Sequence, residues 1–191
     1  VLRRKNKNRG NHMLLTRHSF ISGLAAIALL AGNIAYAADD ATKRIMVYGD
    51  SNTWGYMPVE TGPTTRYSAD VRWPGVMEAE LGSEYEVIEE GLSARTTDIP
   101  DPSLPHISGA GLDGSAYLSS AIATHHPLDL VVIMLGTNDV KAMFDRSPFR
   151  IALGVGKLID IVEQTGGGVG TSYPAPKVLV LSPPPHRRCG S

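Results

Sequence analysis

The sequence is poor in cysteine and in histidine patterns that bind metals. Its only cysteine, Cys189, is the third residue from the end of the 191-residue chain, so no intramolecular disulfide can form. Without a disulfide, the folded protein must be held together by its apolar core, even if it is exported to an oxidising compartment. The six histidines show no ligand spacing beyond the adjacent pair His125 and His126, which we expect in a loop before Pro127. We expect no metal and no other cofactor.

The chain also lacks a basic surplus outside its first residues. All 19 acidic residues lie from Asp39 onward with only 12 of the 18 basic ones, a formal charge of 12 − 19 = −7 for that part. Nucleic acid binding typically needs a basic surface. The acidic balance argues against nucleic acid as a partner.

No uninterrupted apolar stretch is long enough to favour a permanent membrane anchor. From Met13 the chain runs through Arg17 into an apolar segment, residues 20–34, that contains polar and glycine positions and is followed by Ala35-Tyr36-Ala37. This order is typical of a secretory signal peptide, whereas a membrane span would be longer. We expect a leader and signal peptide over residues 1–37, with the signal at about Met13–Ala37. The remainder, 38–191, would be a single periplasmic or secreted domain.

Strand and helix patterns alternate along the domain. Short apolar runs predict strands over residues 45–48, 85–88, 128–135 and 177–182, and helical spacing predicts helices over 71–81, 116–123 and 148–162. This alternation predicts an α/β fold, a doubly wound α/β/α sandwich with a mostly parallel sheet. Ligands bind at the carboxyl ends of such strands. The polar turns that follow three of the strands, at Ser51, Ala94 and Asn138, should therefore meet at one edge.

The first of these turns carries the candidate nucleophile. An apolar strand ends in Gly49-Asp50-Ser51, where residues that cap helices begin. The free backbone N–H groups at a helix start suit an oxygen that becomes negative during acyl transfer. Ser51 is thus a candidate nucleophile, although a serine in this pattern can also serve only as a cap.

The other two turns offer donors for that oxygen. The backbone N–H groups of Ser51 and Ala94 and the side-chain amide of Asn138 are the candidates. One such donor typically lowers the barrier by about 3 to 4 kcal/mol. The three turns together predict an ester-type reaction through serine.

These segments resemble the SGNH/GDSL hydrolase superfamily. Residues 49–51 (Gly-Asp-Ser) resemble its first block, 91–97 (Gly-Leu-Ser-Ala-Arg-Thr-Thr) its second and 136–139 (Gly-Thr-Asn-Asp) its third, in the family's order. The resemblance extends from Arg44 to about Pro185. It implies the flavodoxin-like fold of that family and a carboxylic ester hydrolase that forms an acyl-enzyme on Ser51.

Further segments look like the arylesterase and acyltransferase branch of the superfamily. They are Trp54, residues 59–60, 70–73 and 172–176. Members of this branch act on small esters such as acetates, and some transfer the acyl group to alcohols or peroxide. Trp54 is expected either to line the substrate pocket or to pack in the core, and Asp50 to support the turn. The expected partner is a small-molecule ester, and a homo-oligomer is possible.

Two departures from the family stand out. Ala94 occupies a position where the family usually has glycine, which requires that the backbone angle suit alanine. Family members also carry an Asp-x-x-His segment near the C-terminus that supplies the base, but His186 is preceded three residues earlier by Pro183. We expect that the chain is truncated or frame-shifted past its last strand, so that the C-terminal part of the domain is missing.

The missing base leaves alternatives open. Losing a triad member typically lowers the rate by about 10⁴ to 10⁶, so the chain is expected to be a weakly active or inactive member of an esterase family. A non-catalytic relative that binds acyl groups or glycans, or a non-functional gene fragment, are the alternatives.

Overall fold

Four parallel strands form the centre of the protein. The computed structural model describes residues 42–104 and 108–184. The strands are β1 (Lys43–Gly49), β2 (Tyr85–Gly91), β3 (Leu130–Met134) and β4 (Lys177–Val180), in the sheet order β2-β1-β3-β4. The leader and signal peptide predicted over 1–37, together with His106, His186 and Cys189, lie outside the described residues, so export stays a prediction.

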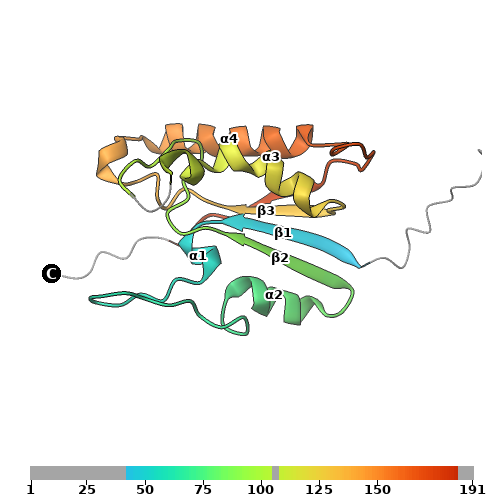
Figure 1. Cartoon of the computed structure of the whole chain (residues 1–191), viewed down its shortest axis with the longest axis horizontal. Coiled ribbons are helices and arrows are strands. Elements are labelled where there is room, and N and C mark those ends of the chain that lie inside the picture. The colour runs from blue at the N-terminus through green and yellow to red at the C-terminus, as the bar shows by residue number, and fades with distance from the viewer. Residues whose placement is uncertain (1–41, 105–107, 185–191) are drawn as a thin grey trace, which may run out of the picture. The chain divides into compact units, whose positions relative to one another are not determined.

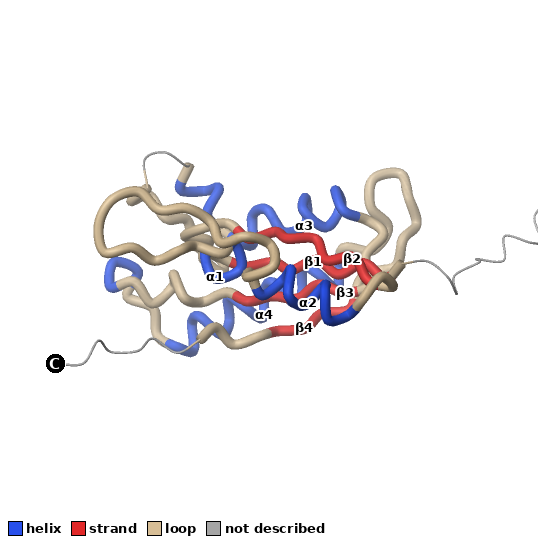
Figure 2. Tube along the Cα trace, turned by 90° about the horizontal axis from the view of Figure 1, so that it is seen from below, coloured by secondary structure: helices blue, strands red, loops and turns tan. Residues whose placement is uncertain are grey.

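Helices cover both faces of this sheet, as Figures 1 and 2 show. On one face lie α1 (Ser51–Trp54) and α2 (Trp73–Leu81), and on the other α3 (Gly114–His125) and α4 (Pro148–Gln164). Two 3₁₀ turns, η1 (Gly109–Leu112) and η2 (Ala142–Phe144), lie in the connections. The predicted doubly wound α/β/α sandwich is confirmed.

The strand order places a crevice at the end of β1. The connection from β1 to β2 runs one way along the sheet, while the next connection returns past β1 to β3. β1 therefore leads into α1 and α2 on one face of the sheet, while its neighbour β3 leads into α4 on the other (Figure 1), and such a switch point opens a crevice at the carboxyl ends of the strands. Ser51 follows β1 directly at this point.

Most of the buried apolar side chains lie under α3 and α4. The larger core joins Met46 and Tyr48 of β1 to Leu118 of α3 and Leu158 of α4, all fully buried. The opposite face has a smaller buried core. Because alternate residues of β1 enter the two cores, the strand is buried on both faces, as its continuous apolar run predicts.

Two element boundaries differ from the sequence-based expectation. α3 begins at Gly114 because Asp113 caps it, accepting hydrogen bonds from the backbone N–H groups of Ser115 and Ala116. It extends to His125, so the expectation that His125 lies in a loop was wrong. β4 ends at Val180, two residues before the expected end, and within the described residues it pairs only with β3.

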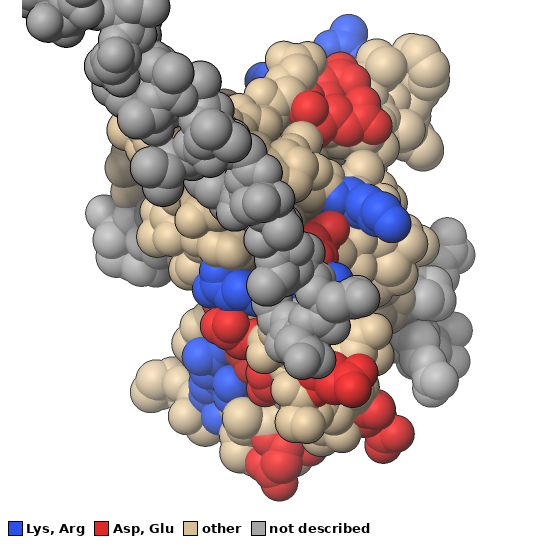
Figure 3. Space-filling view, turned by 90° about the vertical axis from the view of Figure 1, so that its right-hand side faces the viewer, with Lys and Arg blue, Asp and Glu red and all other residues tan. Residues whose placement is uncertain are grey.

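Charged side chains at the amino ends of the strands are paired. Arg44 Nε lies 2.9 Å from Glu86 Oε2 and Lys43 Nζ 3.9 Å from Asp129 Oδ1. Figure 3, which views this end of the molecule, shows basic and acidic groups interleaved in the part not covered by grey atoms. Within the described residues, no helix has the length and apolar character needed to cross a membrane.

Candidate active site

Ser51 is the first residue of α1, directly after the tight turn that ends β1. Oδ1 of Asp50 caps this helix by accepting hydrogen bonds from the backbone N–H of Asn52 at 2.9 Å and from its side-chain amide at 3.0 Å. Gly49 is required here because a Cβ on it would lie 2.0 Å from Oγ1 of Thr53. The turn therefore fixes the backbone of Ser51 at the carboxyl end of the sheet.

Asp50 is fully buried, and its carboxylate is only half satisfied. Its Oδ2 has no hydrogen-bond partner among the described residues. Burial raises the pKa of Asp50 above its ordinary value, while the hydrogen bonds from Asn52 act in the opposite direction. Asp50 thus caps the helix that begins at the candidate nucleophile, and its burial disfavours the ionised form of its own carboxyl group.

Ala94 lies in the turn after β2 with a left-handed backbone. Its φ of 72° is one of two positive values among the described non-glycine residues. The turn is closed by a 3.0 Å hydrogen bond from the Arg95 N–H to the carbonyl of Leu92. Such a conformation costs an alanine about 1 to 2 kcal/mol. The backbone angle at this position is therefore one that glycine adopts more readily, and Ala94 adopts it under strain.

Asn138 joins the turn after β3 to the turn after β2. Its Nδ2 donates a 3.1 Å hydrogen bond to the backbone carbonyl of Arg95, the residue after Ala94. Its neighbour Thr137 accepts a 3.3 Å hydrogen bond from the side chain of Asn52, the residue after Ser51. The three sequence motifs therefore meet at one edge of the sheet, as the strand pattern predicts.

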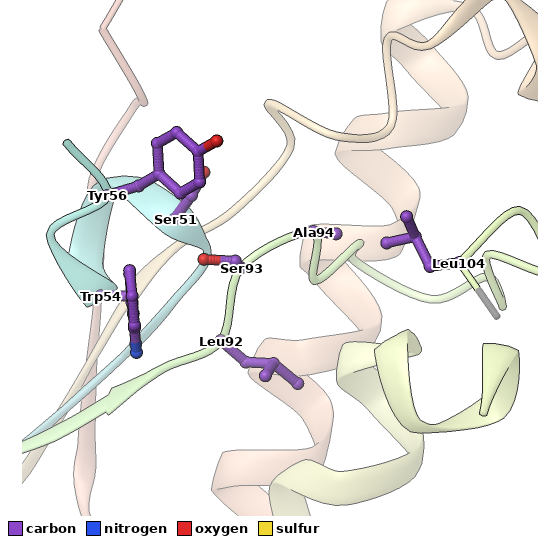
Figure 4. A pocket seen from close by; sticks show the side chains of 7 residues that line it. All are labelled: Ser51, Trp54, Tyr56, Leu92, Ser93, Ala94 and Leu104. Carbon is purple, nitrogen blue, oxygen red and sulfur yellow. The ribbon is translucent and has the colours of Figure 1, made fainter. Parts of the chain in front are cut away.

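A cavity opens beside these turns. Its volume is about 560 Å³, and it is lined by Ser51, Trp54, Tyr56, Leu92, Ser93, Ala94 and Leu104. In Figure 4, Ser51, Trp54 and Tyr56 project from α1 and the residues after it, and Leu104 lies across the cavity. Trp54 thus lines the pocket, whereas Asn138 reaches the site only from behind the Ala94 turn. Sequence reasoning missed Tyr56 and Leu104, and it assigned no role to Leu92 and Ser93, although both lie in the second motif.

A buried ionic network lies behind the turns. Asp139, fully buried, accepts hydrogen bonds from Thr97 and from Arg146, whose Nη1 lies 2.8 Å from Oδ1 of Asp139 and 2.6 Å from Oδ1 of Asp98. Sequence reasoning did not identify this network, although Asp139 belongs to the third motif. Its arginine comes from the loop before α4, and no local pattern indicates that contact.

The described histidines lie away from Ser51. His125 ends α3, and its backbone carbonyl accepts a hydrogen bond from Arg44 of β1. Its ring lies 2.9 Å from Glu90, and that of His126 lies 3.2 Å from the Thr165 carbonyl. Neither ring lines the cavity beside Ser51. Among the described residues, no cluster of acidic, histidine or cysteine side chains could hold a metal ion.

Comparison with known families agrees with this geometry. Residues 47–190 match the model of the GDSL-like lipase/acylhydrolase family, which is most of the chain. The chain belongs to this family. The match contains the Ser51, Ala94 and Asn138 turns, so the GDSL resemblance of the three motifs is confirmed. No curated protein sequence matches the chain significantly.

Solved structures of other GDSL family members resemble this one. An inhibitor-bound aryl esterase from M. smegmatis is 59% identical over 75% of this chain and 65% of its own, with a TM-score of 0.70. The carbohydrate acetylesterase Est24 from Sinorhizobium meliloti is 54% identical with the same coverage and TM-score. The chain therefore spans 65% of the length of both relatives.

Proposed function

We propose that the protein acts as a serine esterase or acyltransferase on small acyl esters, with Ser51 as the nucleophile. One observation carries this proposal: Ser51 and Ala94 line the same cavity, and Asn138 is hydrogen-bonded to the turn that holds Ala94. These positions support Ser51 as nucleophile and the Ala94 N–H as oxyanion donor beside a space large enough for a small ester, with Asn138 adjoining from behind the Ala94 turn.

The reaction would proceed in two acyl transfers. Oγ of Ser51 attacks the ester carbonyl carbon and gives its proton to a base from solution, which returns it to the leaving alcohol, while the carbonyl electrons move to the oxygen. The backbone N–H groups of Ser51 and Ala94 and the Asn138 amide stabilise that charge. The bond to the alcohol then breaks, the alcohol leaves with a proton, and water or a second alcohol takes the acyl group from Ser51.

The lining of the cavity supports an ester with an apolar part. Trp54, Tyr56, Leu92 and Leu104 contribute most of the side chains around Ser51. The relatives are described as an aryl esterase and a carbohydrate acetylesterase. Both descriptions involve small esters, so an aryl acetate is the reasonable first substrate.

We propose that turnover by this chain is low, because no histidine of the described residues lines the cavity beside Ser51 and a serine hydroxyl without a base is a weak nucleophile. His125 and His126 are engaged elsewhere. An external base should then raise the rate. Hydrolysis of p-nitrophenyl acetate is therefore measured with and without added imidazole, and the reaction of imidazole alone is subtracted.

The decisive variant is Ser51→Ala. We expect hydrolysis that is stimulated by imidazole in the wild type and lost in Ser51→Ala, with Ser119→Ala, an exposed serine on α3, as the matched control. Equal rates in wild type and Ser51→Ala would overturn the proposal. Protection of the fold by an acyl ligand without turnover would instead support the non-catalytic binding relative.

A further inference from the structure

Arg95 is a buried arginine between the motifs of the candidate active site. Only 2% of the residue is exposed. Its guanidinium carbon lies 4.0 Å from the ring centroid of Tyr48 on β1 and 5.7 Å from that of Tyr117 on α3. These cation–π contacts hold the side chain under the turn that carries Ala94.

The side chain of Arg95 ties the ends of two strands together. Its Nη1 donates a 3.1 Å hydrogen bond to the carbonyl of Gly49, the last residue of β1, and another to the carbonyl of Glu90 in β2. Gly49 is two residues before Ser51. One guanidinium nitrogen therefore links the strand that delivers the nucleophile to the strand that delivers Ala94.

The backbone of Arg95 makes the connection to the third motif. Its carbonyl accepts the 3.1 Å hydrogen bond from Nδ2 of Asn138, and its N–H closes the turn around Ala94 by donating to Leu92. A single residue thus contacts the first motif through its side chain and the second and third through its backbone.

We propose that Arg95 is the positioning residue that aligns Ser51, the Ala94 N–H and the Asn138 amide for the acyl transfer described above. The inference rests on that proposed function. Arg95 does not line the cavity beside Ser51, so it acts through the groups that it holds.

The chemistry of arginine suits this task. Burying a cation is costly, and an apolar side chain of similar size often packs as well or better. The ion pair with Glu90 is long, with Nη2 3.9 Å from Oε2. Arginine offers planar, fixed donors and an aromatic stacking face that lysine does not reproduce. The fixed donors bind the carbonyls of Gly49 and Glu90, and the stacking face lies against the ring of Tyr48.

A second cavity makes the proposal testable by chemical rescue. It has a volume of about 330 Å³ and is lined by Glu90, Gly91, Leu92, Arg95, Gly111 and Tyr117. Because it opens beside the guanidinium group, a small cation in solution can enter the space left when the side chain is removed. Methylguanidinium is the appropriate probe.

The experiment uses Arg95→Ala and Arg95→Lys in the full chain, with Arg150→Ala, an exposed arginine on α4, as the matched control. The readouts are kcat and KM for p-nitrophenyl acetate with imidazole, and the Kd of phenylboronic acid, whose boron bonds to Ser51 Oγ with release of the hydroxyl proton. We expect kcat to fall about 10² to 10³-fold, as on loss of an oxyanion donor, with little change in KM.

The boronate measurement does not require turnover. We expect the Kd of phenylboronic acid to rise at least about tenfold in both Arg95 variants, which corresponds to about 1.4 kcal/mol. Methylguanidinium should restore the boronate affinity of Arg95→Ala but not that of Arg95→Lys. Arg150→Ala should behave as wild type. Circular dichroism spectra report whether each variant is folded.

Each outcome is informative. Folded Arg95 variants with wild-type kcat and boronate affinity would overturn the positioning role while leaving the esterase proposal intact. Unfolding of both variants without recovery in methylguanidinium would show a merely structural role. A wild-type chain that neither binds boronate through Ser51 nor hydrolyses the ester through it would overturn the proposed function and the positioning role with it.

Discussion

The buried carboxylate of Asp139 accepts two hydrogen bonds from Thr97, one from the backbone N–H at 3.0 Å and one from the hydroxyl at 2.6 Å. Asp139 follows Asn138 in the third motif, and Thr97 is the last residue of the second. This pair therefore ties together the two turns that carry Ala94 and Asn138.

Removing the hydroxyl in Thr97→Val should weaken this connection. A buried charged acceptor loses one donor, so we expect the free energy of unfolding to fall by about 1 to 3 kcal/mol. Urea denaturation measures the change. Thr124→Val is the matched control, because Thr124 is exposed on α3 and its hydroxyl bonds only to its own helix. Equal stability of the two variants would contradict the prediction.

Ala94→Gly should stabilise the protein. Glycine relieves the positive φ of 72°, a gain of about 1 to 2 kcal/mol, partly offset by the greater freedom of glycine in the unfolded chain, about 0.4 to 1 kcal/mol. We therefore expect the free energy of unfolding, measured by thermal or urea denaturation, to rise by several tenths to about 1 kcal/mol. The control Ala152→Gly, on the exposed side of α4, should lose about 1 kcal/mol. A loss in both variants would contradict the strain assigned to Ala94.

The pH dependence of stability should contain a contribution from Asp50. Burial raises its pKa in the folded protein, so the folded state holds the proton at pH values where the unfolded state has released it. Its contribution to stability therefore falls as the pH rises above the unfolded value of about 3.9 through the folded pKa.

Asp50→Asn removes this contribution and keeps an acceptor for Asn52. The stability of Asp50→Asn relative to wild type should therefore increase as the pH rises across that range, in urea titrations at successive pH values. Asp160→Asn, on the exposed side of α4, controls for the loss of a surface charge. A relative stability independent of pH would contradict the raised pKa.

Lys141 should hold one wall of the cavity through Asp101. Its Nζ lies 2.6 Å from Oδ2 of this fully buried carboxylate, three residues before Leu104. Although burial opposes it, the hydrogen bonds from Lys141 and Ser103 lower the pKa of Asp101. The stabilisation is thus present above about pH 3.9 and is lost as the pH falls through the lower folded value.

Lys141→Met should remove the pH-dependent stabilisation that the Lys141–Asp101 pair provides. It leaves a buried carboxylate with fewer donors, so we expect a loss of about 1 to 3 kcal/mol at pH 7 and faster proteolysis in the loop that carries Leu104. The loss should shrink as the pH falls below about 3.9 and through the lowered folded pKa of Asp101, because the carboxylate then becomes protonated. Lys157→Met, an exposed position on α4, is the control. Identical proteolysis of the two variants would contradict the role of the pair.

Local sequence pattern predicted most of the fold. The apolar run of β3 and the Ser147-Pro148 start of α4 were recognisable because strand burial and helix capping depend on neighbouring residues. The cap at Asp113 was missed, although aspartate before a helical segment is a usable signal. The positions of Ser51, Ala94 and Asn138 at strand ends followed from the same local reasoning.

The contacts that support the site were not predictable in this way. Arg95 reaches Gly49, and Arg146 reaches Asp98, across 46 and 48 residues of sequence. Such pairs depend on which strands are neighbours, and a single sequence carries no direct signal for that choice. Tyr56 and Leu104 enter the cavity from irregular segments, for which periodicity gives no direction.

The sequence by itself determined the order of the motifs, the α/β alternation and the candidate nucleophile, because each depends on residues close together in the chain. Only the tertiary structure decided that Asn138 is bound behind the Ala94 turn, that Oδ2 of Asp50 is buried without a partner among the described residues, and that the His125 ring contacts Glu90 and does not line the cavity beside Ser51. These depend on the order β2-β1-β3-β4, which brings distant segments together at one end of the sheet and separates others to its opposite end.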